Sequence, residues 1–333
     1  MRFFGTMILL LVFSVCLLAQ QRIPQLVLSG NDPVALVQGK KIRGKGSVSV
    51  VRGRFKYVFA NHANKKKFET TPEIFEVQNN GECTFMPGVP GDPDLWEVYK
   101  GRNYLFGTSM CKERFQLSPE TILHPENREK IKVRNVAIVI FDGVELLDWA
   151  GPAEVFSAAQ TVDGQDGFNV YTVAEKAEPI ISQGFVKVIP QYTIANAPKP
   201  EIIVFPGGDI RSFQNSKPAM AWAKAVSGEA DITMSVCTGA FLLSDLKLLD
   251  NKRINTHWAS IRQLRRQVPT ATVMENIRFV DNGQIVTTAG ISAGIDGALH
   301  IVERLLGTPA ARLTAKAMEY NWQPSMTSGG NRK

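Results

Sequence analysis

The sequence predicts an α/β protein, and three observations support this fold class. From residue 133 onward, short apolar runs alternate with segments of helical periodicity. These runs are apolar throughout, which is typical of strands buried on both faces of a parallel sheet. Before residue 126, short β-like runs are interrupted by Gly, Pro and Asn, which indicates a smaller α+β domain. The chain of 333 residues is long enough for both domains.

The second half contains the elements of a flavodoxin-like, doubly wound parallel sheet. Helices are expected over 146–159, after the first strand, and over 291–306, where apolar residues recur from Ile295 to Leu306. Ligands of such sheets bind beyond the carboxyl ends of the strands. The expected strands are 136–141, 169–173, 202–205, 232–236 and 285–287.

The first residues have the pattern of a secretory signal peptide. Arg2 supplies a positive charge, an apolar run covers 7–19, and polar residues end it. We therefore expect an exported protein, periplasmic or extracellular, with an uncleaved membrane anchor as the alternative. The expected organisation is a signal peptide at 1–19, an α+β domain at 23–125, a linker at 126–132, an α/β domain at 133–310 and a C-terminal tail at 311–333.

The net charge of +7 is concentrated in the first domain, over 40–56 and 65–67. No stacking aromatic residues interleave these basic residues in a nucleic-acid-binding motif. We therefore expect no nucleic-acid partner. The pattern favours a solvated basic face, with peripheral contact to an anionic membrane surface as the partner it would suit.

Removal of the signal segment leaves three cysteines, Cys83, Cys111 and Cys237. An oxidising compartment allows one pair and one free thiol. Cys83 with Cys111 is the first pairing to test, and the sequence leaves it open. Cys237 is then the free thiol.

Cys237 lies where a strand over 232–236 is expected to break into a helix that starts near Gly239. A thiol at such a turn points out of the end of the sheet towards solvent. The positive end of the helix dipole there favours the thiolate. The alternative is a buried cysteine that packs as a small apolar side chain.

Two further segments are expected at the same edge of the sheet. Asp148 follows the first strand of the α/β domain in an apolar setting, which suits a general acid or base with a raised pKa. Its alternative role is to cap the following helix. Gly207 and Gly208 follow another strand, and with the N–H of Thr238 they suit an oxyanion-hole-type pocket. A simple turn is the alternative for the two glycines.

His257 is the obvious base to pair with Cys237, although a histidine beside Trp258 is more often structural. No Cys, His or Asp spacing is that of a zinc site, and no G-x-G-x-x-G or P-loop occurs. We expect no metal and no cofactor.

The first domain contains an internal similarity. Tyr57-Val-Phe59 and Tyr104-Leu-Phe106 are separated by 47 residues, and basic–Phe and Pro–Glu pairs follow both at the same offset. Each copy predicts a strand and then a short helix that ends near proline. A duplication is one explanation of this similarity, and chance within two similar hairpin–helix pieces is the other and the preferred interpretation.

Together these segments resemble the ThiJ/PfpI superfamily, which has a class I glutamine-amidotransferase-like fold. The resemblance covers about 133–306, and within the superfamily the chain is most similar to isocyanide hydratases and to the ligand-sensing half of certain AraC-type regulators. The order and spacing of the motifs make the resemblance specific. The matching motifs are 141–156, 205–208, 235–243, 256–258 and 288–296.

This resemblance implies a hydratase or hydrolase that acts on a small electrophilic substrate. Cys237 would be the nucleophile, Asp148 the general acid/base, and Thr238 a residue that holds the site. Thr238 stands where the protease-like branch has a histidine, which argues against peptidase activity and against His257 as the base. The resemblance also implies a homodimer. The alternative is a ligand-binding or thiol redox-sensing protein with the same pocket. The implied oxyanion and substrate-binding residues are Gly207, Gly208, Gly151 and His257.

The first domain resembles a YHS-type domain over about 28–123. This resemblance implies a small interaction or ligand-sampling module. Metal-binding members have a cysteine after Asp-Pro-Val, and Ala35 stands there in this chain, so we expect no metal in this domain. The matching segments are 29–35, 57–60, 68–72, 81–83 and 91–96.

Overall fold

The structure is a computed structural model and describes residues 23–323. The chain forms two units that divide between Glu113 and Arg114, inside helix α4 (Ser109–Leu117). The linker expected at 126–132 belongs to the second of these units. The signal peptide expected at 1–19 lies outside the described residues.

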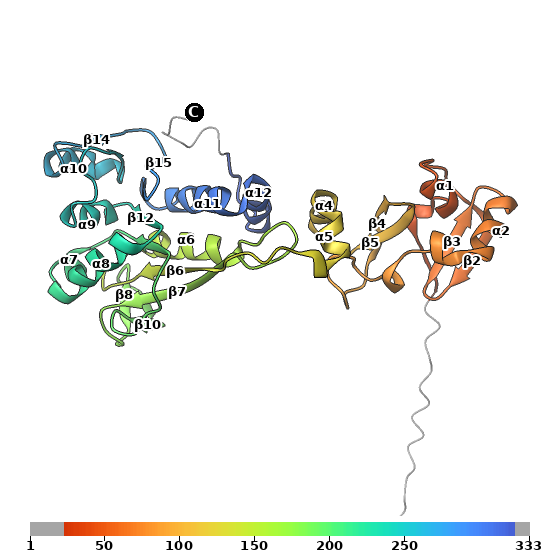
Figure 1. The fold of residues 1–333 in the computed structure, drawn as a ribbon, viewed down its shortest axis with the longest axis horizontal. Helices are drawn as coiled ribbons and strands as arrows, with labels where there is room; N and C mark the ends of the chain where they lie inside the picture. Colours follow the sequence, from red (N-terminus) through yellow and green to blue (C-terminus); the bar gives the residue numbers. More distant parts are fainter. Residues whose placement is uncertain (1–22, 324–333) are drawn as a thin grey trace, which may run out of the picture. The chain divides into compact units, whose positions relative to one another are not determined.

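The second unit is built on a seven-stranded sheet with the order β10-β7-β6-β11-β12-β16-β15 (Figure 1). Neighbouring strands are parallel except β15 and β16, which pair antiparallel. The apolar runs read from the sequence form its central strands, and all four residues of β11 are fully buried. The strands are β6 (Arg134–Val139), β7 (Phe168–Ala174), β10 (Tyr192–Thr193), β11 (Ile202–Phe205), β12 (Ile232–Val236), β15 (Phe279–Asp281) and β16 (Ile285–Thr288).

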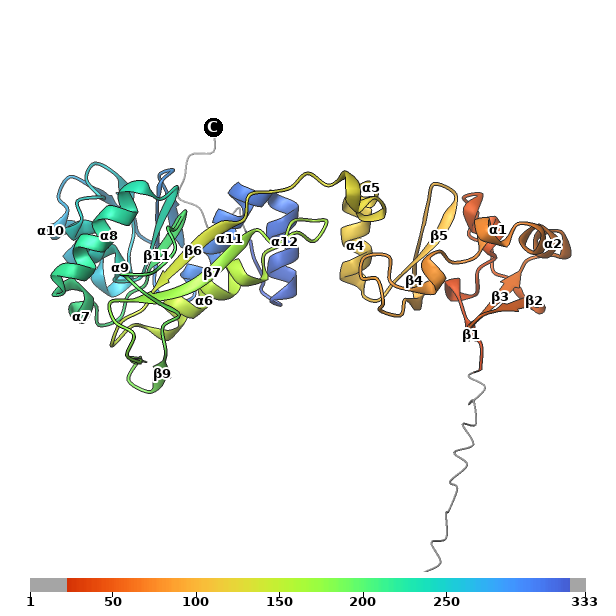
Figure 2. The same ribbon diagram turned by 60° about the horizontal axis from the view of Figure 1, so that its bottom comes forward.

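Helices cover this sheet in two groups, which confirms the doubly wound α/β class. One group packs together against β6, β7, β12 and β16, and consists of α6 (Leu146–Ala158), α11 (Ala293–Leu306) and α12 (Thr308–Ala317). The other group lies apart from α11 and α12 in both views (Figures 1 and 2), and consists of α7 (Arg211–Gln214), α8 (Lys217–Glu229), α9 (Gly239–Asp245) and α10 (Ile261–Gln267).

Helix α12 corrects the tail that the sequence placed at 311–333. It packs on α11 and buries Leu313 and Ala315. Gly307, at φ 90°, is the C-cap of α11 and allows the chain to turn into the next helix. Small additional pairings also occur outside the main sheet: β8 (Ile180–Ser182) with β9 (Val186–Val188), and β13 (Arg253–Ile254) with β14 (Thr272–Val273).

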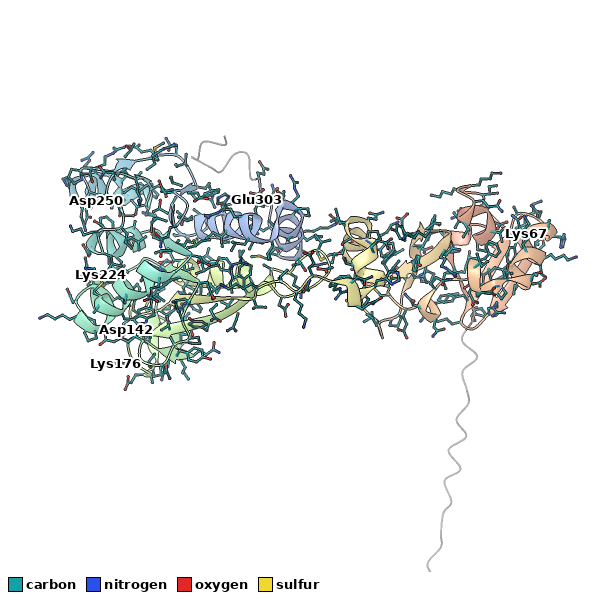
Figure 3. The ribbon with its side chains drawn as sticks, in the orientation of Figure 1. Lys67, Asp142, Lys176, Lys224, Asp250 and Glu303 are labelled. Carbon is teal, nitrogen blue, oxygen red and sulfur yellow. The ribbon has the colours of Figure 1, made fainter. Side chains whose placement is uncertain are left out.

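The first unit is a smaller combination of helices and strand pairs, with an apolar core of its own around Phe59, Phe68 and Leu105. The charged side chain of Lys67 points away from this core (Figure 3). The elements are β1 (Gln25–Leu26), α1 (Pro33–Val37), β2 (Lys45–Arg52), β3 (Phe55–Phe59), α2 (His62–Thr70), α3 (Pro72–Phe75), β4 (Asp92–Tyr99), β5 (Arg102–Phe106) and the first part of α4, and α5 (Pro119–Leu123) follows α4 in the second unit.

These elements occur as two copies of one pattern, which favours duplication over chance as the explanation of the internal similarity. Each copy is an antiparallel strand pair with an irregularity in its register, then a helix of nine residues, then a short helix that begins with proline. The elements β2, β3, α2 and α3 recur as β4, β5, α4 and α5, and each begins 47 residues after its counterpart. The constant offset of 47 residues extends over all four elements of the pattern, and not only over the few residue types that match in the sequence.

No helix within residues 23–323 is both long and apolar enough to cross a membrane.

Candidate functional site

Cys237 lies at a sharp turn between β12 and α9, as the sequence predicted. Its φ of 57° is in the left-handed region, which is rare for a residue with a side chain. The turn is held by the N–H of Cys237, which donates to the carbonyl of Ala289 at 3.0 Å. Gly239 is required at the start of α9, because a Cβ there would collide with the carbonyl oxygen of Phe205. Backbone packing therefore fixes the position of the thiol.

The environment of the thiol differs from the expected one. Cys237 is only 7% exposed, which agrees with the alternative of a buried cysteine and not with a thiol that points to solvent and favours the thiolate. Burial, followed by the nearby charge of Asp148, raises the pKa of Cys237 to about 12. The N–H of Thr238 favours the thiolate and so lowers the pKa of Cys237, but its effect is smaller than that of burial. The resting group is a neutral thiol.

Asp148 is the hydrogen-bond partner of this thiol. It lies in the first turn of α6 and is fully buried. One carboxyl oxygen accepts the N–H of Gly207 at 2.9 Å, and the other accepts the N–H of Ile291 at 3.0 Å. The carboxyl group therefore joins three segments and does not cap the helix. Burial raises the pKa of Asp148 to about 6, against the opposing effect of these N–H donors.

Gly207 and Gly208 hold two side chains of the site in place through their backbone N–H groups. The N–H of Gly207 donates to Asp148, and the N–H of Gly208 donates to the hydroxyl of Thr238 at 3.0 Å. The Thr238 hydroxyl in turn donates to the carbonyl of Gly208 at 3.2 Å. The sequence predicted that these N–H groups would face an oxyanion, but in the structure each has a partner inside the protein. Gly207 also allows close approach, because a Cβ there would collide with Thr238.

His257 packs beside the site without a hydrogen bond to Cys237. Its Nδ1 accepts the N–H of Ala259 at 3.4 Å, and its ring lies against Gly290. The neighbouring Thr256 donates its hydroxyl to the carbonyl of Cys237 at 2.7 Å. The structural role that the sequence offered for His257 agrees with this geometry, and Thr256 is the residue of this motif that touches the turn.

Gly151 belongs to the scaffold of the site. It lies one helical turn after Leu147 on α6, where a Cβ would press on Ile295 of α11. Its lack of a side chain lets the two helices approach closely, although the sequence placed it among the substrate-binding residues.

Three contributors were missed by the sequence reasoning: Thr256, Ala289 and Ile291. Two of them act only through backbone groups, which no side-chain pattern identifies. The one signal for them was their place in motifs of the resemblance. Ile291 has a φ of 57°, unusual for a β-branched residue, and this conformation presents its N–H to Asp148.

The arrangement is suited to proton transfer between sulfur and a bound carbon atom. A neutral thiol donates to a carboxyl group whose pKa lies near neutrality, so the carboxylate can accept the thiol proton and return it to a substrate. Two apolar side chains next to residues of the site in sequence or contact are exposed: Ile291, whose N–H bonds Asp148, by 40%, and Trp258, whose ring lies against His257, by 78%. No cluster of three or more potential metal ligands occurs within the described part of the chain.

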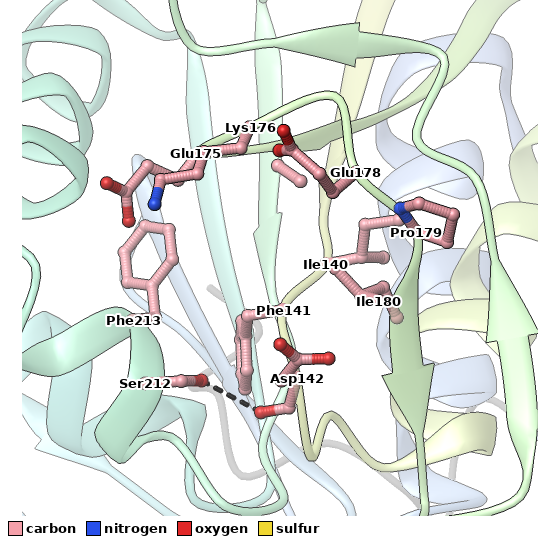
Figure 4. Close-up of a pocket in the computed structure, with 11 residues that line it drawn as sticks. Ile140, Phe141, Asp142, Glu175, Lys176, Glu178, Pro179, Ile180, Ser212 and Phe213 are labelled. Atoms are coloured by element: carbon pink, nitrogen blue, oxygen red, sulfur yellow. Dashed lines mark hydrogen bonds between the residues drawn. The ribbon is translucent and has the colours of Figure 1, made fainter.

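A cavity of about 340 Å³ lies beyond the carboxyl ends of β6 and β7 (Figure 4). Phe141 and Phe213 line it, and their ring centroids are 5.7 Å apart. Asp142 and Glu178 also line it, and the hydroxyl of Ser212 donates to the carbonyl of Asp142 at 2.8 Å. Neither Cys237 nor Asp148 lines this cavity, so it is separate from the thiol site.

Comparison with known proteins agrees with the geometry. The DJ-1/PfpI family profile matches residues 134–304. An isonitrile hydratase of Pseudomonas putida is 29% identical over 196 residues, which cover 58% of this chain and 82% of that protein. The HTH-type transcriptional regulator GbdR of Pseudomonas aeruginosa is 20% identical over 180 residues, 54% of this chain and 48% of the regulator.

Solved structures share the fold. A THiJ/PfpI family protein from Pseudomonas syringae superposes with a TM-score of 0.52 at 23% identity, over 62% of this chain and 88% of that one. At this identity the likeness establishes the α/β architecture of the second unit and no more.

Proposed function

Because the chain belongs to the DJ-1/PfpI family, we propose that its α/β domain is a cysteine-dependent hydratase or hydrolase that acts on a small electrophilic carbon, with an isonitrile as the first substrate to test. One observation carries the proposal: the Cys237 thiol hydrogen-bonds to a buried carboxyl group that two backbone N–H groups hold in place. The similarity to an isonitrile hydratase supports this choice of substrate.

In the first half of the reaction, the sulfur of Cys237 attacks the terminal carbon of the isonitrile. The carboxylate of Asp148 takes the thiol proton as the S–C bond forms, and it then protonates the same carbon. The product is a thioimidate, in which the former isonitrile carbon carries one hydrogen and is bonded to sulfur and to nitrogen. This sequence allows a thiol of high pKa to react, because the thiolate forms only as its proton leaves.

In the second half, water adds to the thioimidate carbon. Asp148, again a carboxylate, removes a proton from the attacking water, and the nitrogen is protonated. The C–S bond then breaks, an N-substituted formamide is released, and Cys237 recovers its proton. The pKa of about 6 for Asp148 suits a group that alternates between acid and base near neutral pH. The exposed side chains of Ile291 and Trp258 would contact an apolar substituent of the substrate.

The proposal is tested with purified protein, simple isonitriles and detection of the formamide. Cys237→Ser and Asp148→Asn are expected to reduce kcat by at least about a hundredfold, within the usual range for nucleophile and acid–base removal. Gly228→Ala, on an exposed stretch of α8 where a Cβ meets nothing, is the control that retains activity. Turnover that survives both site substitutions would sink the mechanism.

A second candidate is a protein that binds a small ligand, or senses oxidants through Cys237, without turnover. The low exposure and raised pKa of the thiol favour ligand binding over rapid oxidation, and a transcriptional regulator is among the relatives. Saturable binding of an isonitrile that survives Cys237→Ser, with no formamide produced, would select this function.

Three further expectations stay predictions: export, a homodimer and the YHS-type character of the first domain. Fractionation of cells that express the tagged full chain tests export, and sedimentation of the purified protein tests the dimer.

A further inference from the structure

The two copies of the pattern place Asp32 and Cys83 in equivalent positions. Each residue closely follows three successive residues with left-handed φ, Leu28–Gly30 in the first copy and Asn79–Gly81 in the second. The N–H of Asp32 donates to the carbonyl of Ile42 at 2.8 Å, and the N–H of Cys83 donates to that of Val89 at 2.7 Å. The two acceptors are 47 residues apart, as are the paired elements.

In the first copy, this position holds a fully buried carboxylate with four hydrogen bonds. One oxygen of Asp32 accepts the N–H groups of Val34 at 2.9 Å and Ala35 at 3.1 Å. The other accepts the N–H of Ala60 at 2.8 Å and the side-chain amide of Asn64 at 2.7 Å. These four donors form a hydrogen-bond cage that suits an anion.

In the second copy, the sulfur of Cys83 occupies the same cage. It accepts backbone N–H groups from Phe85, Met86 and Gly107 and a side-chain hydrogen bond from Cys111. Phe85 and Met86 lie two and three residues after Cys83, as Val34 and Ala35 lie after Asp32. Gly107 and Cys111 lie 47 residues after Ala60 and Asn64. All four donors of the first copy therefore have counterparts in the second.

The cage that surrounds the carboxyl group of Asp32 in the first copy favours a thiolate at Cys83 in the second. The hydrogen bond from Cys111, with help from the backbone donors, holds the pKa of Cys83 well below that of an ordinary thiol. The same bond and burial raise the pKa of Cys111, whose sulfur also accepts the hydroxyl of Thr108 at 3.2 Å. Cys83 is thus the more acidic thiol of the pair, and both cysteines are free in this structure.

We propose that Cys83 and Cys111 form a redox-active dithiol, a covalent modification site that closes reversibly to an intramolecular disulfide by exchange with a small-molecule disulfide such as glutathione disulfide. The site is separate from Cys237, and it does not depend on the function proposed for the α/β domain.

The exchange proceeds in two displacements. The Cys83 thiolate attacks one sulfur of the oxidant, the oxidant S–S bond breaks, and one small thiolate leaves. Cys111 then loses its proton to the departing thiolate or to water and attacks the Cys83 sulfur, which expels the second small thiolate. The dithiol gives up two electrons, and the oxidant disulfide becomes two thiols.

The segment 84–90, which directly follows Cys83, would give access to the pair if it opened. Cys83 is 1% exposed and Cys111 is 4% exposed, so a protein disulfide is too large to reach them in this conformation. The segment from Pro87 to Pro90 is exposed and carries the carbonyl of Val89 that holds Cys83. Opening of this segment limits the rate of exchange and does not affect its equilibrium.

The test equilibrates the full chain, with Cys16→Ser to remove an unrelated thiol, in glutathione buffers of increasing disulfide content. Acid quenching, alkylation and mass spectrometry then locate each thiol. We expect a peptide that links Cys83 to Cys111, a chain lighter by two hydrogens, and complete return on reduction, with Cys237 still alkylated. Alkylation of both Cys83 and Cys111 throughout the series would overturn the proposal, as would linkage of either to Cys237.

The first copy supplies matched variants, because it carries other side chains at the two equivalent positions. Cys111→Asn restores the amide of Asn64, and it should trap a glutathione adduct on Cys83 because the resolving thiol is gone. Cys83→Asp restores the carboxylate of Asp32, and it should leave Cys111 unmodified. Circular dichroism checks that both variants fold. An adduct on Cys111 in Cys83→Asp, or none on Cys83 in Cys111→Asn, would contradict the assignment of the attacking thiol.

Discussion

At the scale of single residues, the chemistry of the α/β domain depends on how Asp148 and Cys237 share one proton. The carboxyl group is buried, which raises its pKa, and it lies against the thiol, whose pKa it raises further. The charge of Asp148 disfavours the thiolate, whereas the hydrogen bond from Cys237 favours the carboxylate and partly offsets its burial. The carboxylate can therefore accept the thiol proton when a substrate arrives.

Asp148→Asn should make Cys237 more reactive towards alkylating reagents while it abolishes turnover. The substitution removes the negative charge and the acceptor that raise the thiol pKa. Each unit by which the pKa falls increases the thiolate fraction about tenfold below the pKa. The rate of iodoacetamide modification from pH 7 to 10, with Gly228→Ala as control, measures this. A slower rate than in the natural chain would show that the carboxylate activates the resting thiol.

The pH dependence of stability should also report Asp148. Its pKa is raised from 3.8 to about 6 in the folded chain, so between these values the folded state binds more protons than the unfolded state. Stability from this group is present below pH 4 and is lost as pH rises through 6, by about 2 to 3 kcal/mol. In Asp148→Asn this decrease should be absent. Urea unfolding from pH 4 to 7 measures it, and parallel curves for both proteins would refute it.

At the scale of elements, the turn from β12 to α9 is set by backbone contacts around one glycine. Gly239→Ala would drive a Cβ into the carbonyl of Phe205, and backbone cannot move aside as a side chain can. We expect a loss of about 2 to 4 kcal/mol in the free energy of unfolding, as for overpacking and strain, together with loss of activity.

The matched control is Gly228→Ala, in α8, where a Cβ meets no atom. Alanine there should stabilise the helix by about 0.5 to 1 kcal/mol. Equal effects of the two substitutions in urea unfolding would show that the β12–α9 turn tolerates a side chain.

The elements also show how far the sequence could predict this fold. Runs such as Ile202–Phe205 were found because a strand buried on both faces is apolar throughout. Strands of two or three residues, such as β10 and β15, have no period to detect. Helix α12 was missed although its apolar face packs on α11, because the polar residues that follow it suggested a tail.

The candidate site divides in the same way. The positions of Cys237 and Asp148 at the ends of strands were predictable, because the sequence itself shows a reactive side chain that follows an apolar run. The partners of the glycine N–H groups and the contribution of Ile291 were not, because they depend on which backbone groups meet in space. The thiolate expected at Cys237 was wrong because the burial of a turn cannot be read from its neighbours in sequence.

At the scale of the whole molecule, the two apolar cores have no residue in common. Calorimetry should therefore resolve two unfolding transitions. Phe68→Ala, in the first core, and Phe205→Ala, in the second, each remove a fully buried ring, at a cost of about 3 to 5 kcal/mol. Each should lower one transition temperature and leave the other in place. A single transition lowered by both substitutions would mean that the cores unfold as one.

The two copies of the hydrogen-bond cage can be compared with each other when the protein is exposed to an oxidant. One copy holds a carboxyl group that a thiol oxidant does not change, and the other holds a sulfur that two-electron oxidation converts to a disulfide. The first cage therefore serves as an internal control for the response of the second cage to oxidants. A response to oxidants that appears at the second cage and spares the first reports thiol chemistry, whereas a response at both reports a general loosening of the domain.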